Sequence, residues 1–310
     1  PVYGRWPVPT GVPITDRLDV QRTLGAYVQD QISLTDRLQV RVGGRVDSFL
    51  LRVDNRLLNT EGRRSRARFS PQAGVVYEIA APVSLYAAYG EGYRANIGTD
   101  ARGNVFEPET STSVEAGVKL VAFGGRLNGT VAVYQLDKAN VLATDTINPG
   151  FSVAIGKARS RGVELDVNGQ LPGRVDVLLS YAYTDAEARS RVLDPNFSFQ
   201  ISPGDPLINI PKHNANVQLA KHWTFGAREA LFGAGVQYVG ERSGQTGTRF
   251  MLPAHTLARV FGEIDLTPET TLFASVSNLF DERWYANSYA PVWVQPGAPR
   301  TATIGVRARF

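Results

Sequence analysis

Hydrophobic and polar residues alternate along most of this chain, and the alternation returns in one segment after another. Near the N-terminus, Leu38, Val40 and Val42 face one way, while Gln39 and Arg41 face the other. A period of two residues is the spacing of a β-strand that has one apolar and one polar face. The repetition of this pattern therefore predicts an all-β protein.

Thirteen segments have this strand-like character. They are residues 20–34, 37–53, 66–79, 83–94, 111–122, 126–142, 153–171, 174–186, 212–224, 230–241, 255–267, 270–279 and 300–310. Full charges stand in the middle of several polar faces, for example at Glu164, Asp166 and Arg259. A β-sandwich could expose such charges on its outer surface, whereas a wide barrel would place them in a wet lumen and turn the apolar faces to lipid.

The connections between these segments alternate between short and long. The short ones are Thr35–Arg37, Ala80–Pro82, Phe123–Gly125, Pro172–Gly173 and Thr267–Glu269, with Thr224–Glu229 somewhat longer. The long ones are residues 54–65, 95–110, 143–152, 187–211, 242–254 and 280–299. Antiparallel strands joined in this way gather their tight turns at one end. This is typical of a transmembrane antiparallel β-barrel with short periplasmic turns and long extracellular loops.

Composition narrows the alternatives. No run approaches 18 consecutive apolar residues, which excludes a transmembrane helix. Cysteine is absent, which excludes a disulfide scaffold and thiolate metal sites. The net charge of +4 is modest, and we expect the densest basic run, Arg63–Arg68, to lie in a solvated loop rather than on a nucleic-acid surface.

Few residues suggest catalysis or metal binding. His213, His222 and His255 are far apart and have no partner at metal-ligand spacing, so we expect them to be ordinary strand residues. Glu115 and Glu164 are interpreted as charges of the lumen rather than as a catalytic pair. No phosphate-binding loop or nucleophile motif occurs in the sequence.

Six short motifs occur in order along the chain. They are Gly25–Gln31, Tyr89–Arg94, Pro108–Ser111 with Glu115–Lys119, Ser160–Leu165, Asn278–Asp281 and Pro299–Arg300. Together they resemble the motifs of TonB-dependent siderophore receptors of the bacterial outer membrane, most closely the ferrichrome-type branch. The resemblance covers nearly the whole chain.

The resemblance implies a barrel of 22 strands whose lumen is blocked by a plug domain. Residues 1–310 would then form the last 13 strands, without the plug, the segment that contacts TonB and about nine strands. Residues 1–19 would be the remnant of an extracellular loop. Phe310 would lie at the periplasmic end, as the terminal aromatic residue that the barrel-assembly machinery recognises.

The resemblance also implies a function. The complete protein would bind a ferric siderophore outside the cell and import it with energy from the TonB complex. No bond would be made or broken, so the resemblance implies that the protein is not an enzyme. Iron would enter only as part of the bound ligand and not as a resident cofactor, and the other partners would be outer-membrane lipid rather than nucleic acid. Two other classes remain open: a passive, porin-like channel and a secreted soluble β-sandwich.

Aromatic residues at two expected extracellular loops are the candidate ligand contacts. Tyr93, with Arg94, and Phe106 flank one loop, and Trp284, Tyr285, Tyr289 and Trp293, near Phe280, cluster in the last loop and its strand end. Aromatic side chains with polar tips suit a ligand with apolar faces and amide oxygens. Arg102 and Arg283 could attract an anionic complex. An interfacial aromatic girdle is the alternative interpretation.

Overall fold

A computed structural model describes residues 16–57, 59–145, 147–148, 151–194, 197–226 and 228–309 of the chain. The predictions for Phe310 and for the first 15 residues of the expected loop remnant lie outside this range. In the part of the chain that is described, no helix is long and apolar enough to cross a membrane.

Thirteen strands form the main path of one 15-stranded antiparallel sheet, and along this path each strand pairs with the next. They are β1 (Arg17–Ser33), β2 (Leu38–Asn55), β3 (Thr60–Ala80), β4 (Val83–Arg94), β5 (Glu109–Ala122), β6 (Leu127–Thr144), β7 (Ser152–Leu171), β8 (Val175–Ala188), β11 (His213–Phe225), β12 (Arg228–Val239), β15 (His255–Thr267), β16 (Thr270–Ser277) and β19 (Thr301–Ala308). The other two strands of this sheet are short and attach through β6. The predicted number and order of strands are confirmed along the main path. The sheet is not closed, because β1 and β19 stand at its two ends.

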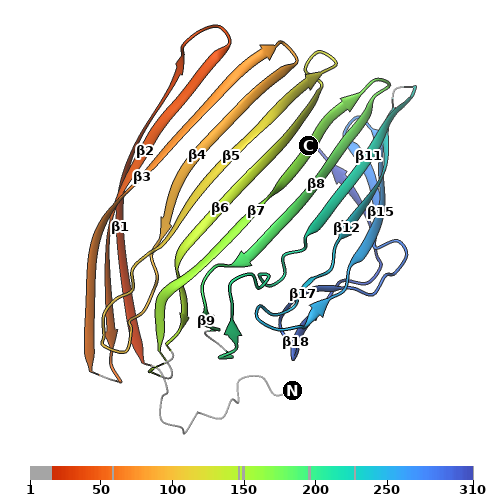
Figure 1. The fold of residues 1–310 in the computed structure, drawn as a ribbon. Coiled ribbons are helices and arrows are strands. Elements are labelled where there is room, and N and C mark those ends of the chain that lie inside the picture. The colour runs from red at the N-terminus through yellow and green to blue at the C-terminus, as the bar shows by residue number, and fades with distance from the viewer. Residues whose placement is uncertain are drawn as a thin grey trace.

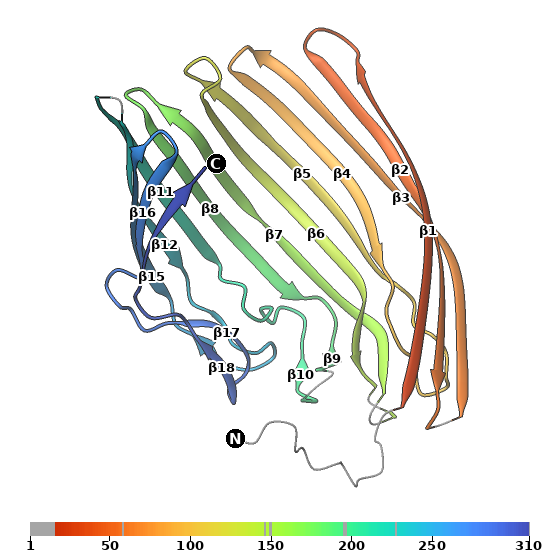
Figure 2. The ribbon, with the colours of Figure 1, turned by 180° about the vertical axis from the view of Figure 1, so that it is seen from behind.

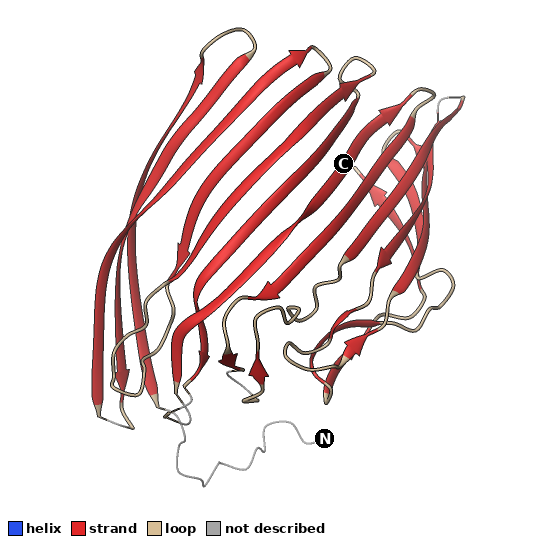
Figure 3. Ribbon diagram, in the orientation of Figure 1, coloured by secondary structure: helices blue, strands red, loops and turns tan. Residues whose placement is uncertain are grey.

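The strands are tilted and the sheet is curved, with the turns β1–β2, β3–β4, β5–β6 and β7–β8 at one end (Figures 1 and 2). The other end carries the longer connections, in which six short strands lie. These are β9 (Val192–Leu193), β10 (Gln200–Ile201), β13 (Arg242–Ser243), β14 (Met251–Leu252), β17 (Tyr285–Ala290) and β18 (Trp293–Pro296). Figure 3 shows that strands and loops make up everything that it colours.

One face of the sheet is continuously apolar because the strand register keeps apolar residues level with one another. Val42 of β2 lies opposite Ala73 of β3, and Val46 lies opposite Phe69. Leu24 of β1, on the same face, is 79% exposed. No other described part of the chain covers this broad apolar face, which is the kind of face that a membrane barrel turns to lipid.

The expected loop at 54–65 is wrong. β2 continues to Asn55 and β3 begins at Thr60, so only a tight connection separates them. The arginine run lies within β3, where Arg63 is level with Arg52 of β2. The run of arginine side chains does not mark a loop here, because β2 and β3 remain paired through it without a break. β3 has 21 residues, roughly twice the 9–11 that a transmembrane strand needs, so this hairpin extends beyond the membrane.

Candidate functional site

Four aromatic rings from two distant segments meet at the end of the sheet that carries the long connections. Phe197 lies 5.4 Å from Tyr289 and 6.3 Å from Trp293, measured between ring centroids. Tyr289 and Trp293 are stacked at 5.7 Å, and Phe199 lies 6.2 Å from Phe197. We call Phe197, Phe199, Tyr289 and Trp293 the mouth aromatic cluster.

The hairpin of β17 and β18 presents two of these rings to solvent. Ser288 and Ala290 are buried at 4% and 2% exposure, so the alternation of a strand turns Tyr289 between them outward. Tyr289 is 45% exposed and Trp293 is 62% exposed. Large exposed aromatic rings that are already grouped need little reorganisation to bind an apolar ligand surface.

A cleft of about 340 Å³ lies beside this hairpin, with Arg283, Trp284 and Tyr285 in its lining. Trp284 is held within the protein: its ring lies 4.7 Å from that of His255, and its Nε1 donates to the carbonyl of Ala298 at 3.1 Å. Tyr285 is 44% exposed. Of the predicted residues in the last loop, Trp284 is held by contacts within the protein, whereas Tyr285, Tyr289 and Trp293 are exposed.

The candidates at the end of β4, Tyr93 and Arg94, and Phe106 in the connection that follows have a different environment. Phe106 is only 8% exposed, and Tyr93 stacks on Phe49 at 5.9 Å. Arg94 donates to Glu109 at 3.1 Å, and Lys138 donates to the same carboxylate at 3.0 Å. Phe106 is thus buried within the connection, and the Arg94–Glu109–Lys138 contacts join the ends of β4, β5 and β6.

A small apolar core lies beneath this connection. Leu51 and Val53 of β2 contact Val105, and all three are at most 3% exposed. Asn96 supports the same connection by donating from its side-chain amide to the carbonyls of Glu107 and Asn140, both at 2.8 Å. The connection is thus anchored by packing and by hydrogen bonds.

The structure does not bring the two groups of candidates together. Six strands lie between β5 and β16 in the sheet, and Figures 1 and 2 place the β17–β18 hairpin away from the lower end of β4. Phe197 and Phe199 were not predicted as site residues. No motif marks them in the sequence, because their contact with Tyr289 and Trp293 is made between loops.

The polar groups at this end of the sheet are mostly engaged in holding loops. Asp145 accepts hydrogen bonds from the Asn148 side chain at 2.9 Å and from the backbone N–H groups of Ile147 and Asn148. These bonds, the one from the Asn148 side chain above all, lower the pKa of Asp145 below its ordinary value. Burial lowers the pKa of Arg242, which nevertheless stays protonated at physiological pH.

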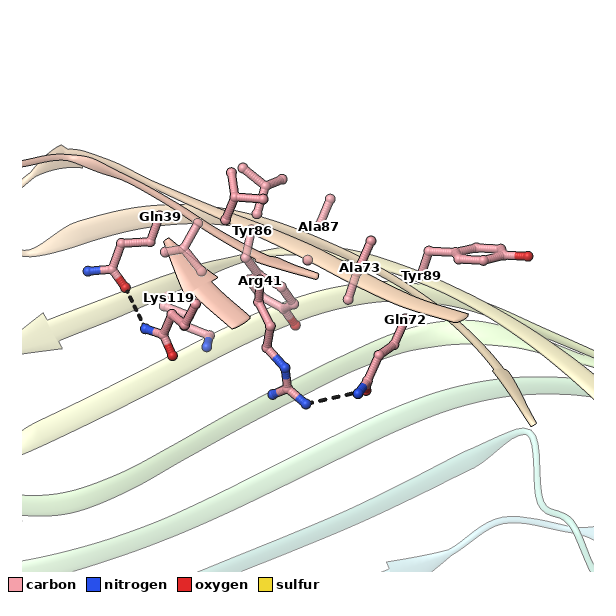
Figure 4. A pocket seen from close by; sticks show the side chains of 14 residues that line it. Gln39, Arg41, Gln72, Ala73, Tyr86, Ala87, Tyr89 and Lys119 are labelled. Carbon is pink, nitrogen blue, oxygen red and sulfur yellow. Dashed lines mark hydrogen bonds between the residues drawn. The ribbon is translucent and has the colours of Figure 1, made fainter. Parts of the chain in front are cut away.

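A second hollow, of about 490 Å³, lies on the polar face near the tight turn between β1 and β2. Figure 4 shows Gln39, Arg41 and Gln72 extending from the same side of the strands. Arg41 donates to Gln72 at 3.3 Å, and Gln31 donates to Gln39 at 3.1 Å. Because these groups bond to one another far from the long connections, we interpret the hollow as part of a polar barrel interior.

Among the described residues, no group of three or more histidine, aspartate and glutamate side chains could hold a metal ion. The rings of the mouth aromatic cluster and the Tyr289 hydroxyl can offer apolar and hydrogen-bonding contacts.

Comparison with known proteins gives one consistent result. The family model described as TonB dependent receptor-like, beta-barrel matches residues 1–279. The metal-pseudopaline receptor CntO of Pseudomonas aeruginosa is 36% identical over 321 residues, covering 100% of this chain and 44% of the receptor. The ferrichrome outer membrane transporter/phage receptor of Escherichia coli K12 is 31% identical over 301 residues, covering 94% of this chain and 39% of the transporter.

A solved structure agrees on the fold. The siderophore receptor PiuA of Acinetobacter baumannii superposes with a TM-score of 0.84 at 19% identity, covering 95% of this chain and 44% of that receptor. The chain thus spans less than half the length of these relatives. It belongs to the family of TonB-dependent receptor β-barrels, which are proteins of the bacterial outer membrane.

Proposed function

We propose that this chain is the barrel portion of a receptor that binds a ferric siderophore outside the cell and imports it with energy from the TonB complex. The observation that carries the proposal is the mouth aromatic cluster, which exposes Tyr289 and Trp293 at the end of the sheet with the long connections. The aromatic faces would cover the apolar parts of the complex, and the Tyr289 hydroxyl would bond its amide oxygens. No bond is made or broken, so the proposed activity is not enzymatic and needs no resident cofactor.

Two observations support this proposal over a passive channel. The family match is to TonB-dependent receptors, and the ferrichrome transporter is among the relatives. The iron would be enclosed in its organic ligand, which fits a cluster that offers rings rather than metal-ligating groups.

A second candidate ligand is a metal complex other than a ferric siderophore. The relative that is 36% identical is a receptor for metal-pseudopaline. The same aromatic contacts could hold either kind of complex, since both present organic surface to the protein. The ligand must therefore be determined by binding.

The test is tryptophan fluorescence of the full-length receptor in detergent, titrated with ferrichrome, ferrioxamine B, ferripyoverdine and a metal-pseudopaline complex. Trp293→Ala and Tyr289→Ala should each weaken binding of the preferred complex by about tenfold or more, as expected for exposed aromatic anchors. Trp223→Ala is the matched control, because Trp223 is 49% exposed near the opposite, tight-turn end and stacks on Phe225. Equal affinity of Trp293→Ala and Trp223→Ala would overturn the proposed site.

A further inference from the structure

Asn209 lies in the connection between β8 and β11, the same connection that carries Phe197 and Phe199. Its side-chain Nδ2 donates to the carbonyl of Ser288 at 2.7 Å, and the backbone N–H of Ser288 donates to its Oδ1 at 3.0 Å. One side chain thus satisfies both backbone groups of a residue 79 positions away. This pattern imitates one rung of a β-ladder.

A third segment joins the same contact. The backbone N–H of Asn209 donates to the carbonyl of Ser243 at 2.8 Å, and the Ser288 hydroxyl donates to the carbonyl of Gly244 at 2.6 Å. Arg242 reinforces the join by donating from Nη2 to the carbonyl of Tyr285 at 2.6 Å. Three connections that are distant in the sequence are therefore hydrogen-bonded into one body.

The residue type fits this position for two physical reasons. Asn209 has φ = +61°, in the left-handed region that asparagine and glycine tolerate best. Only a carboxamide supplies a donor and an acceptor at the spacing of a peptide group. Glycine would keep the backbone but lose the bonds, and aspartate would keep the acceptor but lose the donor.

The contact lies directly beside the mouth aromatic cluster. Ser288 precedes Tyr289 in β17, and its burial fixes the face on which Tyr289 is exposed. Phe197, which lies 5.4 Å from Tyr289, comes from the segment that Asn209 ties down. We propose that Asn209 is the positioning residue of the ligand site, because its amide holds the β17–β18 hairpin in register with the segment that bears Phe197.

This inference rests on the proposed function for its ligand readout, and a ligand-free measurement tests the amide contact separately. In the full-length receptor without ligand, Asn209→Gly should speed hydrogen exchange of the Ser288 amide by about tenfold or more. Asn140→Gly is the matched control: Asn140 has φ = +59° and donates from Nδ2 to the carbonyl of Pro108 at 3.0 Å in the other half of the mouth. It should leave Ser288 exchange unchanged. Equal exchange in Asn209→Gly and the unmodified receptor would overturn the inference.

The ligand readout uses whichever of the four named complexes binds the unmodified receptor most tightly. Asn209→Gly should raise its Kd by about tenfold, and the same change in a Tyr289→Ala background should add less than about twofold, because Asn209 acts through the ring it positions. Additive losses would show only a general structural role and would overturn the inference. Asn209→Asp, which keeps one bond, provides the same comparison if Asn209→Gly fails to assemble.

The two proposals can fail independently. If Tyr289→Ala and Trp293→Ala leave the Kd unchanged, the proposed site is wrong, whatever the Ser288 exchange rate shows. If those two variants lose binding while Asn209→Gly keeps it, the site stands and the positioning role of Asn209 is wrong.

Discussion

Replacing Leu51 by alanine should release the connection between β4 and β5 from the sheet without unfolding the strands. Leu51 is 0% exposed and packs with Val53 and Val105, which lies in that connection. Truncation of a fully buried leucine costs about 2–5 kcal/mol, depending on how far the neighbours collapse into the space. Because every 1.4 kcal/mol is a factor of ten, the population with an open connection should rise roughly 30- to 4,000-fold.

Limited proteolysis with trypsin should report this population, because Arg102 lies in the connection and proteases cut a transiently opened segment fastest. When opening and closing are fast, the cleavage rate follows the equilibrium between the two states. Leu57→Ala is the matched control, since Leu57 is 43% exposed in the turn between β2 and β3. We expect rapid cleavage of full-length Leu51→Ala and slow cleavage of Leu57→Ala and the unmodified receptor.

Equal cleavage rates in the two variants would refute the reasoning, because they would show that the three buried residues do not hold the connection. Assembly is checked first by the shift in gel mobility on heating. A variant that lacks the shift has lost its barrel, and its cleavage rate would then report global unfolding. Val105→Ala, which removes fewer buried atoms on the other side of the same contact, should give a smaller effect in the same direction.

Three further outcomes are expected. Glu109→Gln should destabilise the joined ends of β4, β5 and β6 by about 1–3 kcal/mol in hydrogen exchange, because this buried carboxylate pairs with two cations. Glu61→Gln, in an exposed pair, should change stability by less than about 1 kcal/mol. Gly297→Ala should push the Trp284 ring off the backbone and shift its fluorescence to the red, since a Cβ there would overlap the ring; an unchanged spectrum would contradict this placement. Because the pKa of Asp145 is lowered in the folded protein, its hydrogen bonds stabilise the loop fully at pH values above the ordinary carboxyl pKa of 3.8. This stabilisation is lost as the pH falls through the lower pKa of the folded state. Hydrogen exchange of the Ile147 and Asn148 amides, corrected for intrinsic rates, should therefore lose protection in that pH range.

The strands were predictable because each is long and has one apolar face. In β2, the alternation from Leu38 to Val46 places the strand correctly, and the spacing of short and long connections gives the neighbour order. The hydrophobic pattern did not predict the strand at Arg63–Arg68, because these residues do not alternate between apolar and polar. Their backbone nevertheless pairs with β2 without a break. In such a charged segment, the register of strand pairing determines the secondary structure more than the residue types do.

The candidate site was predictable only in part. Tyr289 and Trp293 attract attention as large aromatic residues in an expected outer loop, and the structure groups them. Phe197 joins them through contacts between loops, which no local pattern encodes. Phe106 has the same residue type but is buried, because it lies over a core that forms only when its connection folds back onto the sheet.

The tip of the β2–β3 hairpin can be labelled from outside on living cells. Because it is longer than a membrane crossing requires, its tip at Leu57 stands clear of the lipid on the side of the long connections. The chain has no cysteine, so a thiol introduced at Leu57 would be its only one. A membrane-impermeant maleimide applied to intact bacteria would then label that site from outside, and the same reagent should leave a cysteine placed at Gly124, in a tight turn at the opposite end, unmodified until the outer membrane is breached.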